Sequence, residues 1–234
     1  MRERGNILFL ILLAVVLFAA LSYAVTRGER GQVKSISEEK AASYASVLLQ
    51  RGALIENTVH RMLANGVPPL QLSWQDPAGG STADPNTSCT SNACRVYYSG
   101  GGGIESLPVP LEATDPDASA SWKLSTGEGS MGTTIVSIAG VGSGLPDAVL
   151  LWRSVRREVC DAINIAEGIY KKGDAMLNDN ISGSSQSGFE GAMTDWPVLP
   201  ADVFGNGDPR IKGHRVFCVP RNSTYYFYYT VYVR

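Results

Sequence analysis

Nonpolar residues fill nearly every position of residues 7–25, with two polar exceptions near the end of the run. A charged leader over residues 1–5, which ends in Gly5, precedes this run. As a helix, these nineteen residues would rise about 28 Å, which is close to the hydrocarbon thickness of a bilayer. The pattern therefore predicts a transmembrane helix over residues 6–27.

Charges on the two sides of this run predict its orientation. Arg2 and Arg4 precede it, which favours a cytoplasmic N-terminus. Three basic residues follow the run, Arg27, Arg30 and Lys34, and favour the opposite orientation. The charges on the two sides therefore nearly balance, and the very short leader and the large following domain decide for a cytoplasmic N-terminus. We expect a single-pass membrane protein whose C-terminal domain is exported.

A second helix is predicted after a joint over residues 28–35, because this stretch contains two glycines. Ser35 and the glutamate three positions later have the spacing of a capping box. Apolar residues then recur at helical spacing, with charged and amide side chains on the other face. Gly66 and Pro68 are typical of a helix end. We expect an amphipathic helix over residues 36–66 that packs one face on a sheet.

The remaining residues, 67–234, alternate between turn-rich stretches and short apolar patterns. We expect an α+β fold: a long N-terminal transmembrane and amphipathic helix packed on a small antiparallel sheet, with an extra internal helix and long loops. The predicted elements of this head domain are strands over Arg95–Ser99, Ser121–Thr126 and Thr133–Ala139, a helix over Pro146–Glu167, and a C-terminal hairpin of His214–Pro220 and Thr224–Val233. Gly100–Gly103 is expected to be a flexible or sharply turned loop, and 173–191 an exposed one.

Composition supports an exported domain and excludes one class of partner. The formal net charge is -2 and no basic patch stands out, so nucleic-acid binding has no electrostatic support. The chain beyond residue 65 is rich in Gly, Ser, Thr, Asn, Asp and Pro, and its aromatic residues are mostly Tyr and Trp. This composition is typical of a loop-rich, β-containing extracytoplasmic domain.

Four cysteines, Cys89, Cys94, Cys160 and Cys218, all follow the apolar run. An even number in an exported domain favours disulfides over metal ligation or thiol chemistry. Three pairings are possible. We favour a tight loop between Cys89 and Cys94, with Cys160–Cys218 joining the predicted internal helix to a C-terminal strand.

The candidate chemistry is weak. Residues 127–132 match G-x-G-x-x-G, but a strand is predicted after them rather than the helix that a dinucleotide site needs. Residues 140–144 lie between a predicted strand and helix but lack the third glycine of that fingerprint. His60 and His214 have no recognisable nucleophile motif beside them. We therefore expect no catalytic residue, no cofactor and no enzyme activity.

The apolar run has two interpretations. A cleaved Sec-type signal peptide would share the basic start, and Ser22-Tyr23-Ala24 offers a cleavage site. However, the run exceeds the usual signal-peptide core of about 7–15 residues. A retained N-terminal helix fits the pattern better.

The opening resembles the type IV pilin and type II secretion pseudopilin family, in which a short leader ending in Gly precedes a hydrophobic helix that serves as membrane anchor and filament core. Gly5 matches the residue before prepilin peptidase cleavage, and Asn6 would become the new N-terminus, which is methylated in this family. The resemblance covers about the first 65 residues. The chain also resembles a pilin-like group of alphaproteobacterial proteins that shares the opening Gly-Asn-Ile-Leu-Phe-Leu-Ile.

Two residues depart from the family pattern. Asn6 stands where a Phe or Met is typical, and Leu10 stands where most members carry a Glu that pairs with a neighbouring subunit's amino terminus. The loss of this Glu resembles tip-type minor pseudopilins or a relative that no longer polymerises. Some major pseudopilins bind calcium in a C-terminal loop, which makes Asp202, Asn206 and Asp208 weak calcium candidates, although turn-forming is the simpler role for such residues.

The resemblance implies a structural subunit of a pilus- or pseudopilus-like assembly, held in the bacterial inner membrane and assembling with like or related subunits through its N-terminal helix. Prepilin peptidase would be its processing partner. One alternative is a periplasmic binding or scaffold protein with a permanent anchor, which Leu10 favours. Another is a Sec-exported enzyme whose N-terminus would lie near Val25.

Overall fold

The computed structural model describes most of the chain beyond residue 35 and a short part before it. The described residues are 9, 11–19, 36–74, 86, 88–104, 110–115, 131–143, 147–179, 203–221 and 224–233, with side chains left out at 131–136. The chain divides into two compact units, Met1–Ser37 and Glu38–Arg234, and each is considered by itself.

The first unit contains a short helix, described at residues 9 and 11–19. Ten described helical residues rise only about 15 Å, about half of the bilayer's hydrocarbon thickness. Among the described residues, no helix combines the length and the apolar character that crossing a membrane requires. The expected long apolar N-terminal helix is therefore wrong. The rest of residues 6–27, and the joint over 28–35, lie outside the described residues.

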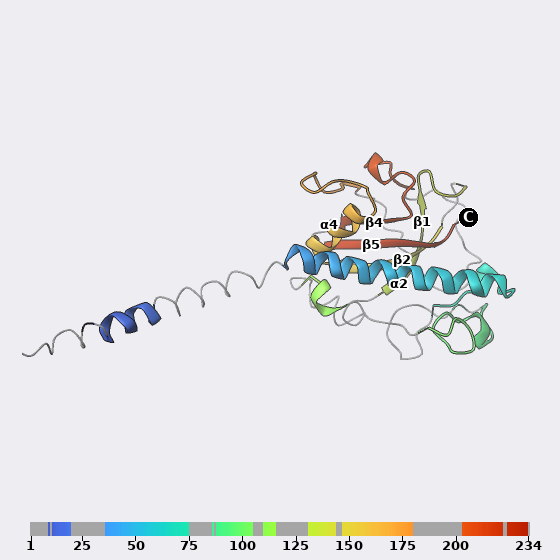
Figure 1. The fold of residues 1–234 in the computed structure, drawn as a ribbon. Coiled ribbons are helices and arrows are strands. Elements are labelled where there is room, and N and C mark those ends of the chain that lie inside the picture. Colours follow the sequence, from blue (N-terminus) through green and yellow to red (C-terminus); the bar gives the residue numbers. More distant parts are fainter. Residues whose placement is uncertain are drawn as a thin grey trace, which may run out of the picture. The chain divides into compact units, whose positions relative to one another are not determined.

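The second unit is an α+β domain built on a five-stranded sheet. The strand order is β3-β1-β2-β5-β4, and all pairs are antiparallel except β3 with β1. Its main elements are α2 (Glu38–Ala64), β1 (Met131–Ile138), β2 (Asp147–Val155), α4 (Arg157–Ala166), β3 (Val203–Phe204), β4 (Val216–Arg221) and β5 (Thr224–Tyr232). Short 3₁₀ turns lie at Pro69–Gln71, Asn92–Cys94, Leu111–Ala113 and Pro209–Ile211. Figure 1 shows α2 and the sheet lying along one another.

The bounds of helix α2 are close to those of the amphipathic helix predicted over residues 36–66. It ends at Ala64, and Gly66 follows with a φ of +89°, a left-handed conformation that glycine adopts without strain. Its buried residues recur every three or four positions and form one stripe that faces the sheet and α4: Ala41, Ala45, Leu48, Gly52, Ile55, Thr58, Val59 and Met62. Ser35, the predicted cap, lies outside the described residues.

The predicted helix over 146–167 is wrong in its first half. The chain forms strand β2 over Asp147–Val155 and becomes helical only from Arg157. Strand β2 lies between β1 and β5, and most of its residues are buried on both faces. A central strand reads as a continuous apolar run, which periodicity alone does not distinguish from a buried helix. Other predicted strands are confirmed as β1, β4 and β5, and Arg221 pairs with Thr224 at the hairpin.

The predicted strand over 95–99 is also wrong, because these residues form turns with one isolated bridge, Ser73 to Arg95. Gly100–Gly103 is a sharp turn rather than an open loop. Cβ atoms added at Gly101 and Gly102 would lie 2.2 and 2.1 Å from the carbonyl oxygens of Arg95 and Val96. The predicted strand over 121–126 lies outside the described residues.

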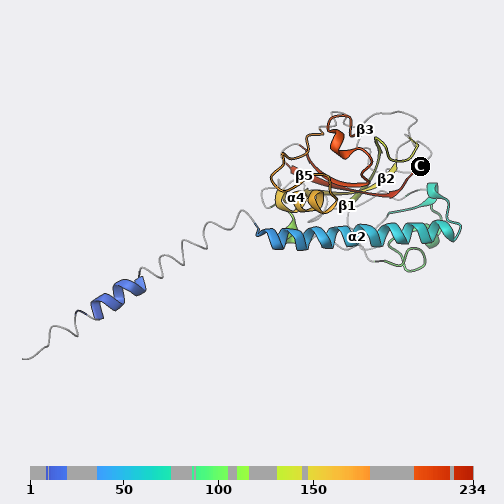
Figure 2. The same ribbon diagram turned by 45° about the horizontal axis from the view of Figure 1, so that its top comes forward.

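The sheet buries both faces. On the helix face, Cys218 and Phe227 pair across β4 and β5; α2 contacts β5, and α4 contacts both strands. The opposite face, called the outer face here, carries a second apolar cluster: Ile138, Val141, Val149, Leu151, Ile169, Tyr170, Leu177, Phe204, Ile211, Phe217, Val219, Tyr226 and Tyr228. The loop over 169–179 and the segment over 203–213 supply the cover for this cluster (Figure 2).

Candidate functional site

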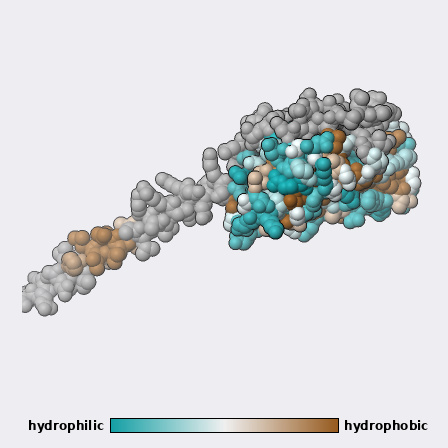
Figure 3. All heavy atoms as spheres, turned by 90° about the horizontal axis from the view of Figure 1, so that it is seen from above, coloured by the Kyte–Doolittle hydropathy of each residue, from teal (hydrophilic) through white to brown (hydrophobic). Residues whose placement is uncertain are grey.

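The N-terminal helix carries the largest group of exposed apolar side chains among the described residues. Because the apolar residues are consecutive, they cover every side of the helix rather than one stripe. Figure 3 shows this segment as a hydrophobic surface. Eight large side chains are between 47% and 76% exposed: Phe9, Ile11, Leu12, Leu13, Val15, Val16, Leu17 and Phe18. A helix of this kind is stable only when protein or lipid covers it.

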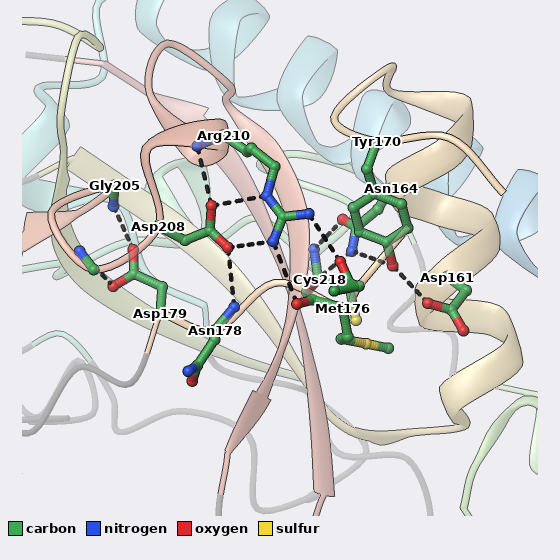
Figure 4. Close-up of polar contacts among 12 residues, drawn as sticks. Asp161, Asn164, Tyr170, Met176, Asn178, Asp179, Gly205, Asp208, Arg210 and Cys218 are labelled. Atoms are coloured by element: carbon green, nitrogen blue, oxygen red, sulfur yellow. Dashed lines mark hydrogen bonds and ion pairs between the residues drawn. The ribbon is translucent and has the colours of Figure 1, made fainter. Parts of the chain in front are cut away.

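In the described part of the head domain, a polar network joins the loop over 174–179 to the segment over 203–213 (Figure 4). Arg210 is at its centre. Its guanidinium donates to both carboxylate oxygens of Asp208, at 2.9 and 2.6 Å. It also donates to the carbonyl oxygens of Ala175, at 2.8 Å, and Met176, at 3.3 Å. One cation therefore ties two segments of the chain together.

The environment of Asp208 favours its charged form. Besides the guanidinium, the backbone N–H groups of Asn178 and Arg210 donate to this buried carboxylate. The hydrogen bond from the Arg210 side chain is the main reason that the pKa of Asp208 falls to about 2, and burial opposes this effect only in part. The carboxylate is thus ionised throughout the physiological range.

This arrangement bears directly on the weak calcium candidates. A carboxylate and backbone carbonyl oxygens are ligands that calcium prefers, and here they surround the Arg210 guanidinium. Asn206 is exposed and Asp202 lies outside the described residues. In the part of the chain that the structure describes, no group of three or more His, Cys, Asp or Glu residues could hold a metal ion.

Asp179 makes a second connection between the same two segments. Its carboxylate accepts from the backbone N–H groups of Gly205 and, at 3.2 Å, Gly207. Gly205 has a φ of +90°, and a Cβ added at Gly207 would lie 2.5 Å from a carboxylate oxygen of Asp179. The two glycines therefore allow the backbone to wrap closely around this carboxylate.

The Cys160–Cys218 disulfide joins α4 to β4, as the sequence favoured. Asn164, one turn further along α4, reinforces it with a pair of hydrogen bonds to the backbone of Cys218: its amide donates to the carbonyl oxygen at 2.7 Å, and its own oxygen accepts from the N–H at 2.8 Å. Strand β4 is at the edge of the sheet, and the Asn164 side chain makes the backbone hydrogen bonds that a further strand would otherwise make to Cys218. This contact reduces the tendency of β4 to pair with another chain.

Helix α2 is fastened to the sheet through Glu56. Its carboxylate accepts from the Tyr229 hydroxyl at 2.8 Å and from the Arg215 guanidinium at 2.6 Å. One turn earlier, Gly52 lies against the Tyr229 ring, and a Cβ added there would approach the ring carbons to 2.2 Å. The residues Gly52, Glu56, Arg215 and Tyr229 are called the helix–sheet seam below.

The Cys89–Cys94 disulfide, also as favoured, closes a small loop near the C-terminal end of α2. The Arg61 side chain donates to the carbonyl oxygen of Gly102 and connects α2 to this part of the chain. Trp74 and Tyr97 pack edge to face beside it, with ring centroids 6.4 Å apart.

The other sequence candidates do not converge on a catalytic centre in the described part. His60 is exposed on α2. His214 precedes β4 and lies near Glu167, whose pKa is raised by burial and lowered in part by the histidine. Residues 140–143 belong to the β1–β2 connection, so no helix follows them as a phosphate site would need. Residues 127–130 of the G-x-G-x-x-G match lie outside the described residues.

Sequence reasoning missed Asp179, Arg210 and the helix–sheet seam. Asp208-Pro209-Arg210 is the one local signal, because Asp before Pro favours a turn that can bring the charges at its two ends together. The partners of Asp179 and Glu56 lie 26 and 173 residues away in sequence. Nothing in a single sequence points to contacts over such separations.

Comparisons with family models, with curated proteins and with solved structures find no match. The function is therefore inferred from the residues and geometry of the chain itself.

Proposed function

We propose that the chain is a structural, non-enzymatic subunit of a pilus- or pseudopilus-like envelope assembly. The observation that carries the proposal is the exposed apolar surface of the helix over residues 11–19. It belongs to the same chain as a disulfide-bonded head domain whose described residues include a buried apolar core.

The physical argument is the cost of leaving this surface in water. Fully burying one large apolar side chain contributes about 1.5–3 kcal/mol, and eight such side chains are exposed here. The favourable free energy is large enough to drive the apolar segment into a bilayer before assembly. Within the bilayer, close packing at small residues such as Ala14 and Ala19 then favours association with equivalent segments of like or related subunits.

Two features support an envelope location. The apolar run over residues 7–25 with arginines ahead of it favours attachment to the inner membrane, with the N-terminus on the cytoplasmic side. The two disulfides agree with an oxidising compartment for the head, such as the periplasm. Prepilin peptidase, acting between Gly5 and Asn6, would remove the charged leader before assembly.

A periplasmic scaffold that stays anchored and never polymerises is the second candidate. Leu10 favours it, because the carboxylate that would pair with a neighbour's amino terminus is missing from this position. A Sec-exported enzyme is the third candidate, and it requires loss of the whole apolar run.

The mass of the mature protein, isolated from the cells that make it, separates the three candidates. An N-terminus at Asn6, especially a methylated one, supports the assembly subunit. An intact N-terminus at Met1 supports the anchored scaffold, and an N-terminus near Val25 supports the exported enzyme and contradicts the proposal. Photo-crosslinking from Val15 should then yield products between subunits, while the same crosslinker at Asn57, an exposed position on α2, serves as the control.

A further inference from the structure

The four cysteines of the sequence pair in the order in which they occur along the chain. Cys89 is bonded to Cys94 and Cys160 to Cys218, and no cysteine is free. Four cysteines allow three pairings, and this is the one in which the two closed loops neither cross nor enclose one another. A chain that emerges from its N-terminal end presents the two partners of each bond consecutively. Oxidation in the order of emergence therefore yields the observed pairing.

The Cys160–Cys218 bond is enclosed by the folded head domain. Both residues are 0% exposed, and α4, which carries Cys160, packs against β4 and β5. Asn164 of the same helix holds the backbone of Cys218 through two hydrogen bonds. Thiol–disulfide exchange requires a thiolate to reach a sulfur atom of the oxidant, and burial in apolar surroundings disfavours the thiolate. The bond therefore forms before α4 docks on β4.

The strand order leaves time for this oxidation. Strand β5 follows β4 along the chain, yet it lies between β2 and β4 in the sheet (Figure 1). Strand β4 joins the sheet through β5, and Cys218 pairs with Phe227 of that strand. Strand β4 is thus not fixed in the sheet until β5 has been made and inserted. Until then, an oxidant can reach the thiols of Cys160 and Cys218.

We propose that the head domain is the substrate of a thiol oxidase, a protein with a strongly oxidising disulfide, which acts before the β4–β5 hairpin enters the sheet and makes a disulfide isomerase unnecessary. The proposal uses the export to an oxidising compartment that is part of the proposed function. It does not depend on assembly through the N-terminal helix.

The chemical step is a pair of thiol–disulfide exchanges. The Cys160 thiolate attacks one sulfur of the oxidase disulfide and forms a mixed disulfide, and the other oxidase sulfur leaves as a thiolate. The Cys218 thiolate then attacks the Sγ of Cys160 and releases the oxidase as a dithiol. Two electrons pass from the cysteine pair to the oxidase, and the two protons of the cysteine thiols end on the oxidase thiols. Cys89 and Cys94 react in the same way, and their short separation makes loop closure easy.

The test is oxidative refolding of the full-length chain. The chain is reduced and unfolded in urea, then diluted into neutral detergent with an oxidised thioredoxin-fold oxidase as the only oxidant. Free thiols are blocked with N-ethylmaleimide, and the disulfides are assigned by peptide mass mapping. We expect the Cys89–Cys94 and Cys160–Cys218 bonds in the main product, at a yield that an added disulfide isomerase does not change. Other pairings in the main product, or a requirement for the isomerase, would overturn the proposal.

Two variants test the chemical step. The double variant Cys89→Ser and Cys94→Ser keeps only the second pair, and it should form the Cys160–Cys218 bond at an unchanged rate. Adding Cys218→Ser to this variant removes the attacking thiol of the second exchange, so a mixed disulfide between Cys160 and the oxidase should accumulate. A failure to detect this species, or a slower bond in the double variant, would contradict the assigned step.

Reduction of the native protein tests the role of burial, because it requires the same access to the sulfur atoms. Dithiothreitol should open the Cys160–Cys218 bond at least about tenfold more slowly in the native chain than in the chain unfolded in urea. Equal rates would show that reagents reach this bond in the folded domain, and would overturn the proposed timing. None of these measurements involves a membrane or an assembly, so their failure leaves the proposed function to its own test.

Discussion

At the scale of single residues, the head domain depends on a few charged groups whose partners are distant in sequence. Arg210 gathers one carboxylate and two carbonyl oxygens, and Asp208 receives donors from three groups. These contacts fix the segment over 203–213 against the outer face. Asp208 is buried, and the Arg210 guanidinium is the main group that stabilises its charge there.

Replacing Arg210 with Met should lower the free energy of unfolding by about 1–3 kcal/mol, because it leaves a buried carboxylate with a weaker set of donors. Urea unfolding followed by tryptophan fluorescence measures the change. Arg157→Met is the control, since its exposed ion pair with Asp161 should contribute less than about 0.5 kcal/mol. Equal effects of the two variants would contradict the assigned role of Arg210.

Asp208 should also make stability depend on pH. Its folded pKa of about 2 lies below the usual value of about 3.9 for an unfolded chain. The folded state therefore binds fewer protons, so this contribution is complete above about pH 4 and is lost as the pH falls towards 2. Asp208→Asn should flatten the unfolding free energy across that range. If the unfolding free energies of the parent and the variant fall equally as the pH is lowered, other groups cause the pH dependence.

At the scale of elements, local signals predicted the helix α2 and the hairpin of β4 and β5 well. Gly66 marks the end of α2, and the apolar stripe identifies the side of the helix that packs on the sheet. The same reasoning failed at β2, because a strand buried on both faces has no alternation to reveal it. The contact of Gly52 with Tyr229 was invisible for another reason: it joins elements far apart in sequence, and glycine inside a helix has no local advantage.

Gly52→Ala tests this helix–sheet contact. Alanine favours a helix over glycine by about 1 kcal/mol, but here its Cβ would meet the Tyr229 ring. Overpacking of this kind costs about 1–3 kcal/mol, so we expect a net loss of stability in thermal unfolding. Asn57→Ala, at an exposed position of the same helix, should be neutral or slightly stabilising. A stabilised Gly52→Ala variant would show that the ring moves away freely.

The two disulfides should differ in their contributions. Cys160 and Cys218 are 58 residues apart, and Cys89 and Cys94 only 5. Loop entropy predicts about 4 kcal/mol for the first cross-link and about 2 kcal/mol for the second. Paired Cys→Ala variants of each, compared by urea unfolding, should therefore show the larger loss for Cys160–Cys218. The opposite order would indicate that packing, rather than chain entropy, determines their contributions.

At the scale of the whole molecule, the chain combines two units of opposite character. The unit over Glu38–Arg234 has a buried core on both faces of its sheet, and the described part of the unit over Met1–Ser37 exposes nearly all of its apolar side chains. The sequence predicted this contrast, but it overestimated the length of the apolar helix. Hydrophobicity reports where side chains prefer to be buried and does not determine where a helix begins and ends.

The most direct test of the central claim is flotation of the full-length chain with vesicles of phosphatidylethanolamine and phosphatidylglycerol. We predict that the chain floats with the vesicles in high salt. A variant with Leu12→Asp and Phe18→Asp should stay in the dense fraction, while its head domain unfolds at the same temperature as before. A parent chain that stays in the dense fraction, or a variant that still floats, would contradict the claim that the apolar segment anchors this protein.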